Sequence, residues 1–329
     1  MTTLWDTTGS DVVKALSAER RSAGSVSSGL ALTLVVIVDE KHVAEAEAAA
    51  TRAAAQHPCR LIIVVRRRPD APEPRLDAEV LIGGRLGPGE GIVLRMYGRL
   101  ALHAESVVLP LLAPDAPVVT WWFGTPPHRI AHDPLGVFAD RRVTDSALAD
   151  DPLAALRNRA EDYAAGDTDL GWTRTTLWRA LCASAFDAIT DEVTSIRVTG
   201  GAHSVRRALL SGWLARRLGT DVVLDDVEAP GISAVEIVAG PITVGLRLEE
   251  SSAVLSRTGQ PDRVLPLPER PLGDLLAEEL RRLDPDEPYA EALETATGVT
   301  GITEHPKVRS HVWHDPMESD DPDPALTIT

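Results

Sequence analysis

The most constraining feature of this sequence is the run Leu30 to Val38 (LALTLVVIV), which carries no charged side chain. A strand built from this run is apolar on both faces, so it must be covered on both sides. An alanine-rich segment from Glu40 to His57 follows and ends at Pro58, and Arg60 to Val65 is a second apolar run. The order strand, helix, strand predicts a parallel sheet with helices packed against it.

The rest of the first half adds strands and helices of the same kind. Leu76 to Ile82 and Ile92 to Tyr97 predict two strands joined by GGRLGPGEG, a glycine-rich segment typical of a hairpin connection. Arg99 to Leu109 predicts a helix, and Pro117 to Phe123 (PVVTWWF) predicts another buried strand. A loop rich in proline follows, and a charged helix over residues 152–165 closes this half.

The second half also predicts helices and strands, and its connections are shorter. Its last three predicted strands are separated by few residues, so we expect them to be antiparallel neighbours. The predicted helices are Thr173–Asp187, Ser204–Leu218 and Leu272–Leu283, and the predicted strands are Val193–Thr199, Asp221–Val227, Ala234–Val238 and Ile242–Glu249.

These segments together predict an α/β protein of two α/β domains, whose mixed, largely parallel sheets are flanked by helices. A chain of 329 residues is long enough for two cores, and we place the domains at residues 1–168 and 169–313. Residues 314–329 hold five acidic residues, three prolines and no lysine or arginine. Such a segment buries too little apolar surface to order itself, so a disordered acidic C-terminal tail is expected.

The charge balance narrows the choice of partners. Asp and Glu outnumber Lys and Arg by 49 to 33, and the net charge of -16 repels nucleic-acid phosphates and anionic lipids. The first ten residues lack the features of a secretion signal, and no apolar stretch reaches the roughly 20 residues that span a bilayer. Cys59 and Cys182 lie far apart, which fits a reducing compartment. We expect a cytoplasmic protein that binds neither nucleic acid nor membrane.

The sequence contains no complete motif for a catalytic or metal site. The glycines of residues 83–91 lack the GK[ST] ending of a phosphate loop, and a strand follows them where a dinucleotide site needs a helix. His103 and Glu105 form an HxE without the PCxxC of a zinc deaminase, and His128 and His132 stand among prolines that oppose a helix. The sequence also lacks a GxSxG serine elbow. We therefore predict no catalytic residue, no metal and no cofactor.

A candidate anion site lies where a predicted strand turns into a helix. Gly200 and Gly201 precede Ser204, which is placed as the helix N-cap, and Arg206 and Arg207 follow in the first turn. Backbone amides and the positive end of the helix dipole can hold a phosphate or carboxylate at such a turn. A solvated helix start without a ligand is the other interpretation, and the sequence leaves both open.

The seven tryptophans indicate a surface for another protein. Trp121 and Trp122 are adjacent, so a strand points them to opposite faces. Other tryptophans lie beside arginines, and this pair of residue types dominates interface hot spots. The alternative is that each indole fills the core of its own domain. The predicted partner interface consists of Trp121, Trp122, Trp172, Arg174, Trp178 and Arg179.

Three longer segments carry a family resemblance. They are HAESVVLPLLAPDAPVVTWW from His103, DLGWTRTTLWRALCASAFD from Asp169, and SVRRALLSGWLARRLG from Ser204. In this order they resemble the OpcA family of glucose-6-phosphate dehydrogenase assembly proteins. The resemblance covers nearly the whole chain apart from the acidic tail.

The resemblance implies a non-catalytic assembly factor and allosteric activator. Such a protein binds glucose-6-phosphate dehydrogenase and promotes its active oligomer, which supports NADPH supply in the oxidative pentose phosphate pathway. Cyanobacterial relatives are associated with thiol-based redox control, but the sequence shows no close pair of cysteines.

Two other functions stay open at this point. One is a sugar-phosphate enzyme such as a lactonase or isomerase, with its site at the turn from Gly200 to Ser204. The other is a dinucleotide-binding oxidoreductase, which the sequence disfavours because Asp39, Glu40 and Lys41 stand where glycines would follow the first strand.

Overall fold

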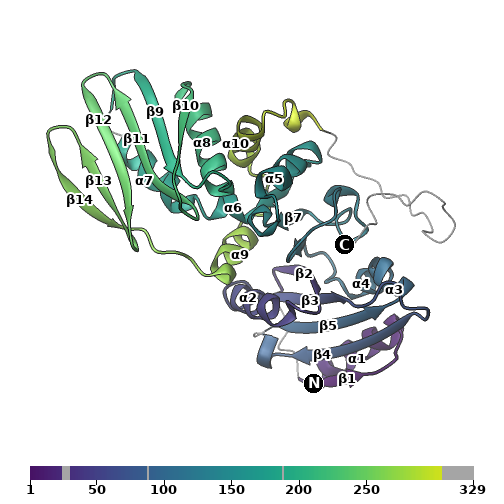
Figure 1. Ribbon diagram of the computed structural model, residues 1–329. Helices are drawn as coiled ribbons and strands as arrows, with labels where there is room; N and C mark the ends of the chain where they lie inside the picture. Colours follow the sequence, from purple (N-terminus) through teal and green to yellow (C-terminus); the bar gives the residue numbers. More distant parts are fainter. Residues whose placement is uncertain (24–29, 87–88, 187–188, 306–329) are drawn as a thin grey trace.

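The computed structural model contains two β-sheets joined by a group of helices (Figure 1). It describes residues 1–23, 30–86, 89–186 and 189–305, so the predicted acidic tail, 314–329, lies outside the described residues. Both sheets are mixed and flanked by helices, as predicted for the fold class.

The first sheet has eight strands in the order β1-β4-β5-β3-β2-β6-β7-β8. Parallel pairs connect β5 through to β8, while β4 pairs antiparallel with both β5 and β1. The strands are β1 (Thr2–Leu4), β2 (Leu32–Asp39), β3 (Cys59–Arg66), β4 (Arg75–Ile82), β5 (Glu90–Tyr97), β6 (Val118–Trp122), β7 (Arg141–Thr144) and β8 (Asp167–Asp169). The predicted largely parallel sheet and the hairpin of β4 with β5 are both confirmed here.

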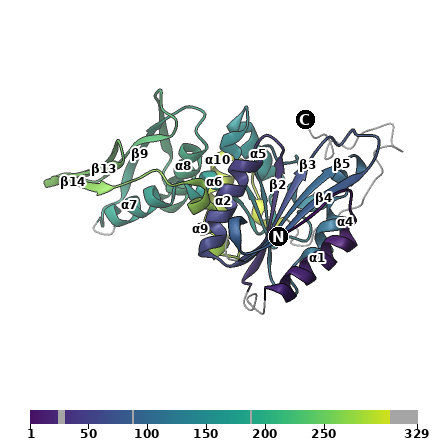
Figure 2. The same ribbon diagram turned by 90° about the horizontal axis from the view of Figure 1, so that it is seen from below.

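Helices cover both faces of this sheet, which is why every residue of β2 except Asp39 is buried and most are apolar (Figure 2). Leu34, Val36 and Val38 pack towards α2 (Val43–Gln56) and α9 (Leu272–Arg281). Val35 and Ile37 face the side of α1 (Gly9–Ser22) and α4 (Ala104–Val108). The helix predicted from Arg99 to Leu109 is interrupted at His103, so that α3 (Arg99–Leu102) stands apart from α4.

The second sheet has six strands in the order β10-β9-β11-β12-β13-β14. They are β9 (Val193–Gly200), β10 (Val222–Asp226), β11 (Ile232–Ala239), β12 (Ile242–Glu249), β13 (Ser252–Arg257) and β14 (Gln260–Pro266). Helices α7 (Thr176–Phe186) and α8 (Val205–Leu218) pack their apolar side chains against one face of it.

The prediction of a largely parallel sheet is wrong for this second half. Only β9 and β10 pair in parallel, across the crossover helix α8, and the other pairs are antiparallel. The turns from β11 to β14 are too short to carry the crossover that parallel neighbours need. The expectation of antiparallel pairing, drawn from these short connections, is confirmed for β11 with β12. It is wrong for β10, which pairs in parallel with β9 and is not a neighbour of β11.

The chain returns to the first sheet after β14. Helix α9 lies inside the predicted C-terminal domain, yet Leu275, Leu276 and Leu280 belong to the core beneath the first sheet. Between the sheets, α5 (Pro152–Glu161), α6 (Leu170–Thr173), α8 and α10 (Glu287–Thr297) share a further apolar cluster. The predicted domain boundaries stay a prediction, and the two halves are joined by more than a linker.

Candidate partner-binding site at the junction of the sheets

The adjacent tryptophans of β6 lie in different cores. Trp121 is buried on the α2 side of the sheet, where its ring meets Phe123 edge-on at 5.4 Å between centroids. Trp122 is buried on the opposite side with Ile130 and Leu135. The prediction that they point to opposite faces is confirmed, and each fills one layer of its own sheet.

Trp172 lies in the group of helices between the two sheets (α5, α6, α8 and α10), which we call the junction. It is buried on α6, and its indole Nε1 donates a hydrogen bond to Asp286 Oδ2 at 2.9 Å. The guanidinium of Arg179 stacks on the indole, with its carbon 3.6 Å from the ring centroid. Burial lowers the pKa of Arg179 to about 10. Trp172 and Arg179 thus form a desolvated cation–π pair.

Arg174 anchors the same region to the first sheet. Its guanidinium forms a bidentate ion pair with Asp145, with N to O distances of 2.7 and 2.6 Å. Next to it, Asp169 accepts hydrogen bonds from the amides of Ser146 and Gly171, both at 2.8 Å. Burial and the neighbouring Asp145 carboxylate raise the pKa of Asp169, while these hydrogen bonds oppose the shift.

The six predicted interface residues therefore divide into groups. Trp172, Arg174 and Arg179 come together at the junction, whereas Trp178 is buried in the core of the second sheet with Cys182. Trp121 and Trp122 belong to the first sheet. All four indoles are buried in this chain, so a partner can meet only Arg174 and Arg179 directly without a rearrangement.

A polar link that the sequence did not indicate crosses the junction. Arg141 of β7 forms a buried ion pair with Glu279 of α9, and donates to the carbonyl of Asp284 at 2.8 Å. The hydroxyl of Thr173 donates to the other carboxylate oxygen of Glu279 at 2.6 Å. One carboxylate from the C-terminal half is thus held by β7 of the first sheet and by α6.

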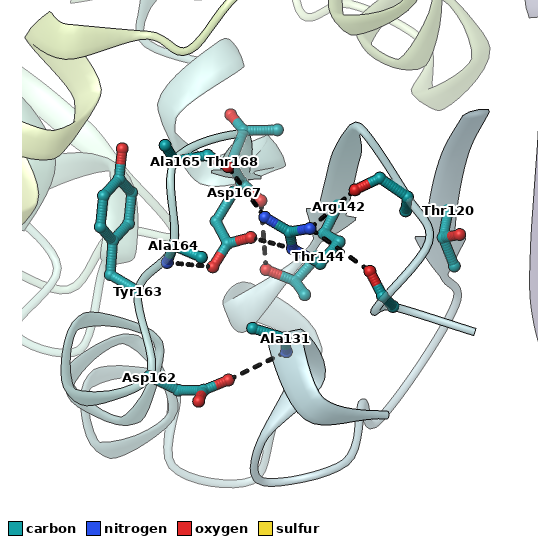
Figure 3. Close-up of polar contacts among 12 residues, drawn as sticks. Thr120, Ala131, Arg142, Thr144, Asp162, Tyr163, Ala164, Ala165, Asp167 and Thr168 are labelled. Carbon is teal, nitrogen blue, oxygen red and sulfur yellow. Dashed lines mark hydrogen bonds and ion pairs between the residues drawn. The ribbon is translucent and has the colours of Figure 1, made fainter. Parts of the chain in front are cut away.

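Arg142, the next residue of β7, binds groups within the first half of the chain (Figure 3). Its guanidinium pairs with Asp167 of β8 and donates to the carbonyls of Ala139 at 2.8 Å and Ala165 at 2.9 Å. Burial raises the pKa of Asp167, and the charge of Arg142 opposes that shift. These contacts tie the last two strands of the first sheet to each other.

The candidate anion site has the predicted local form. Ser204 caps α8, and its Oγ accepts from the amide of Arg207 at 3.2 Å. A cavity of about 790 Å³ opens beside Gly201, Ser204 and Arg206. However, a Cβ on Gly200 would lie 2.4 Å from the carbonyl oxygen of Gly231, so this glycine allows two backbones to approach closely.

Both arginines of this turn already have partners in the chain. Arg206 forms a bidentate pair with Glu269 at 3.0 and 2.7 Å. Arg207 is buried and donates to Asp226 Oδ1 at 2.6 Å and to the carbonyl of Asp225 at 3.1 Å. An anion would have to compete with these groups, and the site stays a prediction.

Two family models match the chain one after the other. Residues 50–161 match the N-terminal domain of the OpcA glucose-6-phosphate dehydrogenase subunit, and residues 165–293 match its C-terminal domain. The chain belongs to the OpcA family. The resemblance drawn from the three segments is confirmed.

One curated relative of this OpcA-family chain is the "Putative OxPP cycle protein OpcA" of Synechocystis sp. (strain ATCC 27184 / PCC 6803 / Kazusa). It is 30% identical over 142 residues, which make up 39% of this chain and 29% of the relative. The match therefore spans less than a third of the relative's length.

Solved structures of low similarity include two oxidoreductases. UDP-N-acetylglucosamine 3-dehydrogenase GnnA from Acidithiobacillus ferrooxidans aligns with a TM-score of 0.39 and 11% identity, over 84% of this chain and 99% of that one. An NAD binding oxidoreductase from Klebsiella pneumoniae aligns with a TM-score of 0.44 and 10% identity, over 85% and 97%. Likenesses of this extent say nothing about the activity of the OpcA-family chain.

The described residues of the OpcA-family chain contain no group of three or more His, Cys, Asp or Glu side chains that could hold a metal. None of the helices in these residues has the length and apolarity to cross a bilayer. After β2, where a dinucleotide would need glycines, the Asp39 carboxylate instead accepts from the amide of His42 at 3.0 Å and contacts its ring at 2.7 Å.

We expect both cysteines of this OpcA-family chain to be unreactive. Cys59 and Cys182 lie in separate cores, and burial raises the pKa of each thiol to about 12. At pH 8 the thiolate fraction of such a group is on the order of 10⁻⁴, against about a quarter for an ordinary cysteine. Labelling by Ellman's reagent should therefore be at least about a thousandfold slower in the folded chain than after unfolding.

The variant Ser251→Cys, which adds a thiol in an exposed turn, is the positive control. It should release one thionitrobenzoate per chain within seconds, and guanidinium should expose the two native thiols. Fast labelling of the folded parent chain would contradict the prediction and would favour thiol-based redox control of this protein.

Proposed function

We propose that this chain is a non-catalytic assembly factor and allosteric activator that binds glucose-6-phosphate dehydrogenase and promotes its active oligomer. It would thereby support NADPH supply in the oxidative pentose phosphate pathway. The observation that carries the proposal is the match of both halves to domains described as a glucose-6-phosphate dehydrogenase subunit. Buried ion pairs between β7 and α9, and between Asp145 and Arg174, support this role, because these polar groups already bind each other within the chain.

An activator of this kind must bind the active state of its partner more tightly than the inactive state, since equal affinity shifts no equilibrium. A difference of about 1–3 kcal/mol changes the population ratio about 5- to 150-fold. Such a difference requires a rigid binding surface, because a surface that adapts to both states discriminates poorly. Two contacts support this requirement: Arg179 stacks on Trp172, and Arg174 pairs with Asp145, the residue that follows β7 of the first sheet.

The decisive experiment mixes the purified chain with its cognate glucose-6-phosphate dehydrogenase. We expect the rate of NADP⁺ reduction at low glucose 6-phosphate to rise at least about fivefold. We also expect sedimentation velocity to show a larger species that contains both proteins. An unrelated acidic protein at the same concentration is the control for nonspecific crowding and charge.

Two outcomes would count against the proposal. One is a dehydrogenase whose rate and sedimentation are unaltered by a large excess of the chain. The other is turnover of a sugar phosphate by the chain alone, which would favour an enzyme at the turn from Gly200 to Ser204.

A further inference from the structure

Four exposed apolar side chains lie on β10 or in the cavity next to its end. The exposed fractions are 47% for Val223, 48% for Leu224, 42% for Val227 and 51% for Leu148. Val223 and Leu224 belong to β10, and Leu148 and Val227 line one cavity together. Single exposed apolar residues are ordinary, but a group of them indicates an interaction site.

Strand β10 also forms a free edge of the second sheet. Among the described strands, β10 pairs only with β9, and it forms one end of the second sheet, beside α8 (Figure 1). The other end, β14, contains Pro261 and Pro266, which remove backbone donors from the edge. Proline is absent from β10, so its outer side can accept an added strand.

A groove of about 540 Å³ runs beside β10. Its floor is α8, and its far wall is formed by α5 and the end of α10. Ser211 on the floor is only 7% exposed, and its Oγ has no hydrogen-bond partner within the described residues. The apolar residues that line the groove include Leu153, Leu156, Ala208, Ala215, Leu224 and Ala296, and the buried Arg207 also lines it.

The charge at this edge is mostly negative. Asp221 and Asp226 lie at the two ends of β10, and Glu228 follows. Asp226 pairs with the buried Arg207, but its own side chain remains 67% exposed. The nearest basic side chain on the far wall, Arg157, already donates to Glu161 and to the carbonyl of Thr297. Asp221 and Glu228 form no ion pair within the described residues, so they are the carboxylates that a docked segment would meet uncompensated.

We propose that the free edge of β10 and the groove behind it bind an extended segment of the partner dehydrogenase as an added strand. Backbone hydrogen bonds to β10 would give affinity, and alternate apolar side chains would enter the groove. Lysine or arginine side chains of that segment would meet Asp221 and Glu228. The identity of the partner rests on the proposed function, whereas the chemistry of the segment follows from the edge, the groove and the charge.

A second copy of this chain fits the edge less well. Its net charge is also -16, and pairing two β10 edges would bring two acidic rims together. Like charges across neighbouring strands destabilise the pairing. A basic, apolar segment of another protein avoids this repulsion.

The test replaces Leu224 with arginine, which puts a cation into the groove and opposes a basic segment. We expect Leu224→Arg to weaken binding of the purified cognate dehydrogenase at least about tenfold by calorimetry. Val264→Arg on β14 is the matched control, because it makes the same kind of change at the opposite edge of the same sheet. It should bind like the parent chain, and both variants should keep the parent melting temperature.

Hydrogen exchange gives a readout that needs no variant. Backbone amides of residues 222–226 should gain protection when the dehydrogenase is added to the parent chain.

A second variant tests the charge at this edge. The double variant Asp221→Asn with Glu228→Gln should bind the dehydrogenase more weakly at low salt, and its binding should depend less on salt concentration.

The failures are distinguishable. If the parent chain does not bind the dehydrogenase, the proposed function fails. If the parent binds while Leu224→Arg binds equally well, or residues 222–226 gain no protection, only the inference about β10 is overturned. A parent chain that self-associates, and a Leu224→Arg variant that is monomeric with normal dehydrogenase binding, would assign the edge to a second copy and overturn it too.

Discussion

Replacing Arg141 with leucine is expected to lower the free energy of unfolding by about 3–5 kcal/mol. The side chain is 1% exposed and pairs across the junction with Glu279, which is 4% exposed. Without Arg141, the Glu279 carboxylate stays buried with the hydroxyl of Thr173 as its remaining side-chain donor. The loss would be measured by urea unfolding of the parent and the variant, with the midpoint and slope compared.

Arg247→Leu is the matched control for this prediction. Arg247 pairs with Glu249 at 2.7 Å, but these side chains are 68% and 51% exposed, so the cost should stay below about 1 kcal/mol. The double variant Arg141→Leu with Glu279→Leu should recover much of the loss, because it leaves no buried charge unpaired. If Arg141→Leu cost no more than Arg247→Leu, the pair would not be what holds α9 to the first sheet.

The central strands of the first sheet could be predicted because nearly all of their residues are buried and most of these are apolar. In β2 and β3 all positions but the last are buried, and apart from Thr33 and Arg60 these buried residues are apolar, so the strands are visible as apolar runs. The hairpin of β4 with β5 was visible for a different reason, since glycines mark its connection.

The outer strands of that sheet could not be predicted by the same reasoning. All residues of β7 (RRVT) and β8 (DTD) are buried, yet most of them are polar. Their charges are neutralised by partners that periodicity does not reveal, such as Glu279, which lies 138 residues from Arg141. The acidic residues next to β7 and within β8 (Asp145, Asp167 and Asp169) are a weak sequence signal of these buried polar contacts.

The predicted partner interface stays a prediction, and only some of its residues lie together. Arg179 stacks on Trp172, and Arg174, two residues from Trp172, pairs with Asp145. Tryptophan is common both in interfaces and in cores, so the residue types alone could not separate the two. The alternative, in which each indole fills a core, describes all four tryptophans of the predicted interface. Exposed apolar residues on β10 were missed because a short strand with acidic ends looks like an ordinary surface strand.

Replacing Trp122 with alanine is expected to lower the free energy of unfolding by about 3–5 kcal/mol. The indole is buried in the same core cluster as Ile130 and Leu135, and a Cβ on Gly136 would lie 3.3 Å from its ring. Alanine would leave a large cavity in this tightly packed cluster. Urea unfolding measures the loss, and the dehydrogenase activation assay is run at a temperature where both proteins remain folded.

Trp122→Phe is the conservative control, and it should cost much less. Among the described residues, the indole Nε1 of Trp122 has no hydrogen-bond partner, so phenylalanine keeps most of the packing and removes an unpaired buried donor. We expect activation per folded molecule to be the same for the parent, Trp122→Ala and Trp122→Phe, because the side chain is buried away from any partner. A Trp122→Ala variant with parental stability and no activation would show instead that this indole contacts the dehydrogenase.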